Sequence, residues 1–170
     1  MKFIQLNESK NLIETLDLTR VSNLEKLVME DFLKIHAIHP SMGVRRKLTL
    51  VNFKDCKSIR NLPNKFEKES LEILILSSCS KVQKLPKFMG NIEHVSQFYL
   101  DGTAITKLLT SIGHLSCLVL LNTRDCKRFV CQPSTIFNLK LFKEVNLSGC
   151  SKLKRLPENL GNAESIVELN

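Results

Sequence analysis

Cysteine and histidine are the residue types in this chain best suited to covalent or metal chemistry. The chain of 170 residues has four histidines and six cysteines, which are Cys56, Cys79, Cys117, Cys126, Cys131 and Cys150. Cys117 follows His114 by three residues, so one hypothesis is a nucleophilic thiol activated by an imidazole. A zinc site is not indicated, because there is no CxxC pair. The N-terminus shows no apolar leader with a small-residue cleavage site, so we expect reduced thiols.

Four of the six cysteines close the same pattern of apolar residues. The clearest copy is Leu71-x-x-Leu74-x-Leu76-x-x-Cys79, and copies start near residues 1, 24, 48, 71, 95, 118 and 142, with a partial unit from residue 166. A repeat of roughly 24 residues with an LxxLxLxx(N/C)xL core is a leucine-rich repeat. Residues 1–170 are therefore predicted to be one array of about seven repeats, with no nucleotide-binding or signalling domain.

The repeat predicts an α/β fold in which coils stack into a solenoid. The LxL part of each unit would be a short parallel strand on the concave face of a curved horseshoe, with an irregular or helical-turn convex side. We expect Leu74, Leu76, Val145 and Leu147 to point into the core and Ser77 to be exposed. The four repeated cysteines would form a buried structural column rather than a catalytic site. Cys117 and Cys131 lie outside that column, so they are the thiols most suited to reaction.

Two departures from the pattern predict local irregularity. The stretch from Asp101 to Ile105 occupies the place of a cysteine turn and is one residue shorter. In the same unit Leu109 replaces the proline that other units have at Pro63, Pro86 and Pro157. Proline fixes φ and has no N–H, which suits an extended return segment.

The basic residues of the chain have a regular place in the repeat. The formal net charge is +8, and many bases follow the cysteine turn. We call one recurring set the basic flank: Lys57, Lys81, Lys84, Lys127, Lys152, Lys154 and Arg155. The flank could be a solvated surface, or it could dock to an acidic protein surface such as a neighbouring domain. Aromatic residues for base stacking are scarce there, which argues against nucleic-acid recognition. No apolar run is long enough to cross a membrane.

Residues on the predicted concave face are candidates for contact with a partner protein. Acidic residues outnumber basic ones at these places. We predict a site near the middle of the array at Asp55, Tyr99, Asp101, Arg124 and Asp125, because neighbouring strands would bring them together. Tyr99 is the only tyrosine, and Tyr and Arg often anchor interfaces. The alternative is that Tyr99 only covers the strand beside it.

Three stretches resemble a known family. They are LSSCSKVQKLP at 76–86, LDGTAITKL at 100–108 and NLSGCSKLKRLP at 146–157. They are similar to the leucine-rich repeats of plant intracellular nucleotide-binding disease-resistance proteins, in the subclass with a Toll/interleukin-1-receptor-like domain. The resemblance implies a non-catalytic module for protein recognition or autoinhibition in defence against pathogens. It implies no cofactor and no metal.

The same resemblance implies a set of partners and a location. The partner would be a pathogen effector, a guarded host protein or a neighbouring receptor domain, in the cytoplasm or, as an alternative, the nucleus. No GxxxxGK[ST] stretch exists, so no phosphate-binding loop is predicted. Because the chain starts and stops inside a repeat, we expect a fragment. The alternatives are a truncated regulatory or decoy product and an enzyme that uses Cys117 with a histidine.

Overall fold

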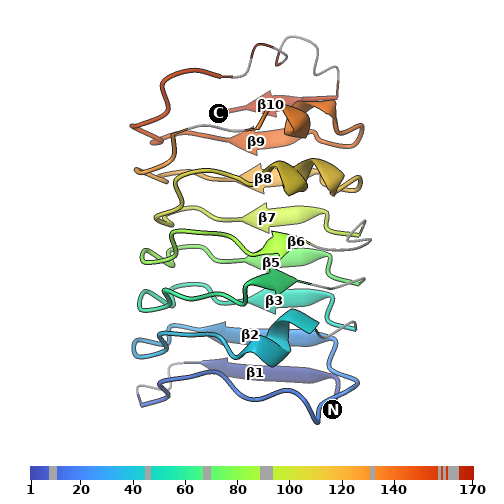
Figure 1. Cartoon of the computed structure of the whole chain (residues 1–170), viewed down its shortest axis with the longest axis vertical. Coiled ribbons are helices and arrows are strands. Elements are labelled where there is room, and N and C mark those ends of the chain that lie inside the picture. Colours follow the sequence, from blue (N-terminus) through green and yellow to red (C-terminus); the bar gives the residue numbers. More distant parts are fainter. Residues whose placement is uncertain are drawn as a thin grey trace.

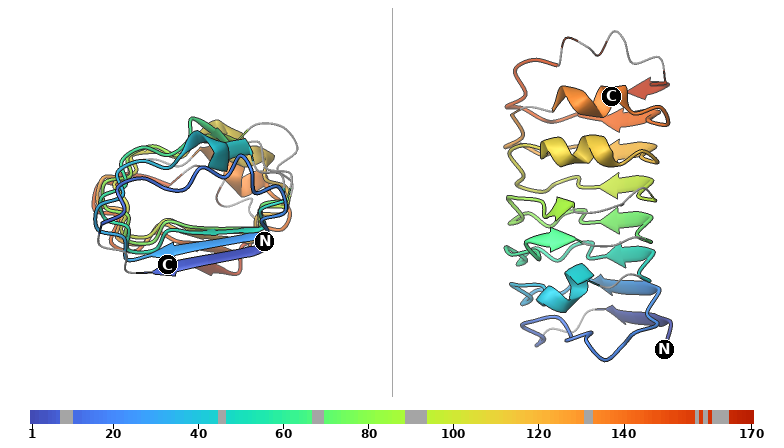
Figure 2. Two further views of the ribbon diagram at one scale, coloured as in Figure 1. Left: turned by 90° about the horizontal axis from the view of Figure 1, so that it is seen from below. Right: turned by 45° about the vertical axis from the view of Figure 1, so that its right-hand side comes forward.

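The computed structural model shows a stack of similar coils in one column, with the two ends of the chain at opposite ends of the stack (Figure 1). It describes residues 1–7, 11–44, 47–66, 70–88, 94–130, 133–156, 158, 160 and 165–170. Each coil contributes a strand, a turn and a return segment (Figure 2). We name a coil by the strand that begins it.

The strands form one parallel sheet along the column. Its eight strands are ordered as in the sequence: β1 (Phe3–Asn7), β2 (Lys26–Glu30), β3 (Leu50–Asn52), β5 (Ile73–Ile75), β7 (Gln97–Tyr99), β8 (Leu120–Asn122), β9 (Glu144–Asn146) and β10 (Glu168–Leu169). The buried residue at the same repeat position of each strand pairs with that of the next, so that Leu27 pairs with Val51, Val51 with Leu74 and Leu74 with Phe98. This register confirms the predicted leucine-rich-repeat fold.

Alternation along the strands places the apolar residues of the repeat in a shared core. Leu74 and Leu76 are 1% and 0% exposed, and Val145 and Leu147 are 0% and 8% exposed. The inward direction predicted for these four residues is confirmed. A single coil cannot bury this face alone, so each coil depends on its neighbours.

The expectation that Ser77 is exposed is wrong. Ser77 is only 8% exposed, and its hydroxyl donates a 2.7 Å hydrogen bond to Asp101 Oδ1 on the next coil. The alternation of the strand ends at this point, because the chain bends into the turn. Ser77 therefore faces its neighbour coil rather than solvent.

The turn after each strand has one residue with a left-handed backbone. Positive φ angles near 60–70° occur directly before the cysteine position in six successive coils, at Asp31, Asp55, Ser78, Gly102, Asp125 and Gly149. Asp and Gly are among the residues that adopt this conformation most readily. The turns are also hydrogen-bonded between coils, since the Asp55 N–H donates to the Ser77 carbonyl at 2.9 Å. The left-handed backbone thus explains why Asp or Gly recurs at this position, which Ser78 occupies in the β5 coil.

The return segments differ between coils and form the face opposite the sheet (Figure 2). Among the described residues, short 3-10 helices are η1 (Pro40–Val44), η2 (Thr110–His114) and η3 (Ser134–Asn138), in the β2, β7 and β8 coils. In the β3 and β5 coils the described parts of the return segments are extended instead, and β4 (Lys65–Phe66) pairs in parallel with β6 (Lys87–Phe88). Pro63 and Pro86 precede these extended pieces, whereas Leu109 directly precedes η2. Pro157 lies outside the described residues.

The β7 coil is shorter at its turn, as predicted. Thr103 stands at the cysteine position and is 3% exposed, and Ile105 follows it after one residue and is fully buried. In the β5 coil two residues separate Cys79 from the matching buried Val82. The strands on both sides keep their register, so the change in length is confined to one turn.

Candidate protein-interaction surfaces

The repeated cysteines form a hydrogen-bonded column inside the solenoid. Each thiol donates to a carbonyl of the preceding coil: Cys56 to Met29 at 3.2 Å, Cys79 to Phe53 at 3.0 Å, Cys126 to Leu100 at 3.1 Å and Cys150 to Thr123 at 3.1 Å. All four residues are at most 8% exposed, as predicted. The column therefore joins neighbouring coils.

Burial also makes these thiols poor nucleophiles. It raises the pKa of Cys56 and of Cys126 to about 11, and it raises the pKa of Cys79 and Cys150 as well. The thiolate is the reactive form of cysteine. A structural role, rather than catalysis, is the chemistry that this environment supports.

The Cys–His hypothesis finds no assembled site in the described part of the chain. His114 ends η2 and is exposed, and Cys117 is half-buried in the turn that follows. No side-chain hydrogen bond joins these two described residues, whereas a nucleophile and its base need one. Cys131, the other candidate thiol, lies outside the described residues.

A serine, a histidine and an aspartate meet on the return side, but not in the order that catalysis requires. Ser41 Oγ lies 2.8 Å from His39 Nδ1, and Asp17 Oδ1 lies 3.6 Å from the same nitrogen. In a hydrolytic triad the serine and the carboxylate face opposite ring nitrogens. Ser41 Oγ also accepts the Leu18 N–H at 2.9 Å. The cluster therefore ties together two coils.

The residues that the structure describes also bear on two other kinds of site, metal sites and membrane-spanning helices. Among them, no group of three or more His, Cys, Asp or Glu residues is placed to hold a metal ion. Within the same residues, no helix has the length and apolar character needed to span a bilayer.

The five residues predicted for partner contact lie on the sheet side, but only one is in a strand. Tyr99 is in β7, half-buried on the outer surface of the sheet, and its hydroxyl donates to Gln97 Oε1 at 3.1 Å. The other four, Asp55, Asp101, Arg124 and Asp125, lie in the turns that follow the strands. Tyr99 thus borders a row of charged turn residues.

Of the charged turn residues, Asp101 is held by the neighbouring coils. Asp101 Oδ1 accepts hydrogen bonds from Ser77 Oγ at 2.7 Å and from Asn122 Nδ2 at 3.2 Å. Arg124 Nε lies 3.3 Å from Asp125 Oδ2. The Asp101 carboxylate is therefore fixed between coils, whereas the exposed Arg124–Asp125 pair is free to reorganise around a partner.

An apolar patch around Tyr99 was not predicted. Leu50, Ile73, Ile75 and Leu120 point outward from neighbouring strands and are half-buried. The register places Ile75 directly beside Tyr99, Ile73 and Leu120 on the two sides of Gln97, and Leu50 beside Ile73. The sequence could have indicated this patch, because these apolar residues occupy x positions of the LxxLxLxx pattern, which lie on the outer side of the strands. We call Leu50, Ile73, Ile75, Tyr99 and Leu120 the sheet-face patch.

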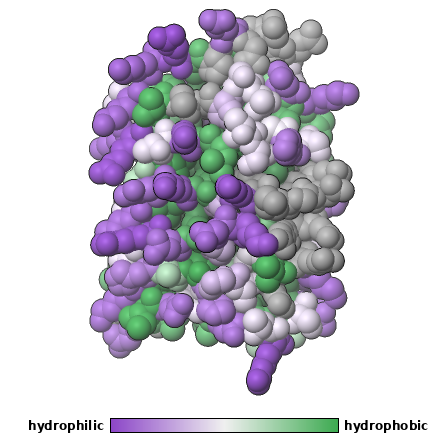
Figure 3. Space-filling view, in the orientation of Figure 1, coloured by the Kyte–Doolittle hydropathy of each residue, from purple (hydrophilic) through white to green (hydrophobic). Residues whose placement is uncertain are grey.

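The basic flank lies along the edge of the column that holds the turns. Its seven lysine and arginine residues are all exposed, and hydrophilic side chains gather along this edge (Figure 3). The flank therefore exists as a surface, distinct from the sheet-face patch.

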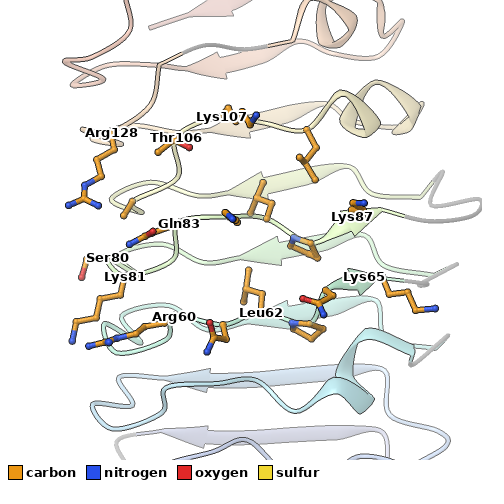
Figure 4. A pocket seen from close by; sticks show the side chains of 18 residues that line it. Arg60, Leu62, Lys65, Ser80, Lys81, Gln83, Lys87, Thr106, Lys107 and Arg128 are labelled. Atoms are coloured by element: carbon orange, nitrogen blue, oxygen red, sulfur yellow. The ribbon is translucent and has the colours of Figure 1, made fainter.

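A basic hollow on the return face was also not predicted. It has a volume of about 1330 Å³ and spans four coils, from Arg60 in the β3 coil to Arg128 in the β8 coil (Figure 4). Its basic lining residues are Arg60, Lys65, Lys81, Lys84, Lys87, Lys107 and Arg128. No acidic residue is among the described residues that line it. Only Lys81 and Lys84 belong also to the basic flank.

The parallel sheet and the repeated left-handed turns together define a leucine-rich-repeat array, a non-catalytic class of repeat domain. Its fold is similar to the leucine-rich-repeat domain of the type III effector XopL, with a TM-score of 0.53 and 14% identity over 98% of this chain and 75% of that one. Residues 67–168 match the family model for RPS4B-like disease resistance proteins, leucine-rich repeats. The chain belongs to this family, within the leucine-rich-repeat region of the TIR-NBS-LRR plant disease resistance proteins.

Relatives support the same assignment over nearly the whole chain. TMV resistance protein N of Nicotiana glutinosa is 35% identical over 170 residues, which is 98% of this chain and 14% of that protein. Disease resistance protein RPS4B of Arabidopsis thaliana is 33% identical over 158 residues, 93% of this chain and 11% of that protein. The chain therefore spans only a small part of the length of these relatives.

Proposed function

We propose that this chain recognises a protein partner through its sheet face, as the recognition module of a plant immune receptor that acts in the cytoplasm. The observation that carries the proposal is the sheet-face patch. It places the aromatic ring of Tyr99 beside the half-exposed Ile75, next to a row in which Gln97 lies between Ile73 and Leu120. Interfaces commonly combine an apolar and aromatic centre with a polar rim.

The charged turn residues supply that rim. Asp55, Asp101, Arg124 and Asp125 follow the strands along one edge of the sheet-face patch. The partner would be a pathogen effector or a guarded host protein. In either case the apolar centre would supply most of the binding energy, because buried anchors dominate binding. The rim would then set orientation and specificity.

The basic flank has a separate proposed role, namely docking to an acidic surface of a neighbouring receptor domain. Its support is the regular row of exposed bases on the turn side. Such a contact would hold the receptor inactive and would weaken as the salt concentration rises, since exposed charge pairs are screened.

The two roles can be separated in a full-length receptor that carries this region. We expect the double change Tyr99→Ala and Arg124→Ala to weaken partner binding while the docking of the repeat region to the rest of the receptor is kept. Reversal of Lys81, Lys84, Lys152 and Lys154 to glutamate should weaken that docking, most strongly at low salt. Co-precipitation at two salt concentrations measures both contacts.

Two negative results together would contradict the proposal. If both sets of changes left partner binding and internal docking intact, neither surface would be an interface. The segment would then act as a spacer that separates other parts of the solenoid.

A further inference from the structure

The basic hollow on the return face owes its shape to a local change in the coils. The described parts of the return segments in the β3 and β5 coils are extended and form the β4–β6 pair, whereas the flanking β2 and β7 coils carry η1 and η2. β4 contacts η1, and β6 contacts η2. A 3-10 helix is wider than an extended chain. The return face therefore projects less in the β3 and β5 coils than in the coils on either side, which leaves a groove.

Basic side chains from successive coils surround this groove. Arg60 comes from the β3 coil, Lys81 and Lys84 from the β5 coil, Lys107 from the β7 coil and Arg128 from the β8 coil, and all five are exposed. Figure 4 shows Arg60, Lys81 and Arg128 at one edge, with Arg128 pointing along the column toward the other two. The like charges repel one another, and an anionic ligand would relieve that repulsion.

The floor of the groove is apolar and lacks aromatic rings. Leu62, Pro63, Leu85 and Pro86 contribute to it, and no aromatic residue is among its described lining residues. Single-stranded nucleic acid is usually held by aromatic side chains on which bases stack. The aliphatic floor and the basic rim of the groove instead suit a peptide that has both apolar and acidic side chains.

The dimensions agree with a short extended segment. The bases lie on four successive coils, and neighbouring coils are spaced as strands of a sheet, so the row covers about 14 Å. An extended peptide rises about 3.3 Å per residue, so four or five residues would cover the row.

We propose that this groove binds an extended acidic peptide segment that lies along the column, with Arg60, Lys81, Lys84, Lys107 and Arg128 pairing with its carboxylates. The groove is on the face opposite the sheet-face patch, so a peptide bound there would leave that patch open to its own partner. The groove shares Lys81 and Lys84 with the basic flank, but its ligand, an extended acidic peptide on the return face, goes beyond the proposed recognition and docking roles.

Binding can be measured with the 170-residue chain and defined probes. The acidic probe is a fluorescent eight-residue peptide of alternating glutamate and valine, and the neutral probe has glutamine in place of glutamate. A thymidine octanucleotide tests the other polyanion class. We expect fluorescence anisotropy to show binding of the acidic peptide, weaker binding of the oligonucleotide and none of the neutral peptide.

Matched variants then locate the site. The double change Lys81→Glu and Lys84→Glu reverses two charges in the groove. Lys152→Glu with Arg155→Glu reverses two charges at the same repeat positions in the β9 coil, outside the groove. Both alter the net charge equally. We expect the groove variant to weaken binding at least about tenfold and the β9 variant to change it less than about threefold.

Each contrary result would overturn the proposal. Equal losses in the two double variants would show attraction to overall charge, and tighter binding of the oligonucleotide would indicate a nucleic-acid surface. If the groove variant proved unfolded in a thermal melt, Lys107→Gln would replace it. Unchanged binding of the acidic peptide to the folded Lys107→Gln variant would likewise overturn it. Failure of the receptor-level experiments above would leave this test unaffected.

Discussion

The folded chain should lose stability at alkaline pH because of its buried thiols. Burial raises the pKa of Cys56 and Cys126 from 9.0 to about 11. In the unfolded chain both thiols return to the ordinary value and release their protons first. The unfolded state therefore binds fewer protons above pH 9, which favours unfolding. The stabilisation is fully present below about pH 9 and is lost as the pH rises to about 11.

The size of the effect follows from the two pKa values. Near pH 10 the unfolded thiol is mostly ionised, whereas the folded thiol is mostly protonated. The difference destabilises the fold by about 1.4 kcal/mol for each thiol at that pH, or about 2.7 kcal/mol for Cys56 and Cys126 together. Near pH 8 the same difference is less than about 0.1 kcal/mol per thiol.

Urea unfolding at pH 8 and pH 10 measures this loss. Lysine titration also changes over this range, so the comparison is between the parent chain and a Cys56→Ala/Cys126→Ala variant. The variant should be less stable at pH 8, but it should lose about 2.5 kcal/mol less between the two pH values. Cys117→Ala is the control, and it should keep the parent's alkaline loss because the column is intact. Equal alkaline losses in all three chains would refute the assignment of the effect to the buried column.

Two further changes test the core and the turns. Leu76→Ala should lower the free energy of unfolding by about 2–5 kcal/mol, because the side chain is fully buried. Ile75→Ala, at the neighbouring half-buried residue, should lower it by about 1 kcal/mol. Similar losses in urea unfolding would contradict the assignment of Leu76 as inward and Ile75 as outward. Gly149→Ala should cost about 1–2 kcal/mol, because φ is 72° and the new Cβ would meet the carboxylate of Asp125. Ser78→Gly at the same repeat position should be neutral or gain up to about 1 kcal/mol, and a loss in both variants would argue against backbone strain as the cause.

The parts of this structure that recur in every coil could be predicted from the sequence. The positions of Leu74 and Leu76 define which side of a strand is buried, and the spacing of the copies then aligns the strands. Cys79 could be placed in the interior for the same reason. The left-handed turn residues had a signal too, since Asp or Gly precedes the cysteine position in most copies.

Features that depend on contacts between unlike coils could not be predicted in this way. Ser77 is buried because Asp101 of the next coil accepts its hydrogen bond, and nothing within its own repeat indicates this. The groove exists because two extended return segments lie between two 3-10 helices. A period in the sequence describes what the coils share, whereas these sites arise from their differences.

The shorter turn at Thr103 has a consequence for how such a chain can change over generations. One residue fewer alters the β7 coil alone, and the strands before and after it still pair residue for residue. If a gene duplication or an unequal exchange inserted a whole coil, the strands on both sides could therefore still pair with the strand of that coil. New combinations of sheet side and return side could be sampled without redesign of the interior, so the exposed side chains can diversify faster than the scaffold that carries them.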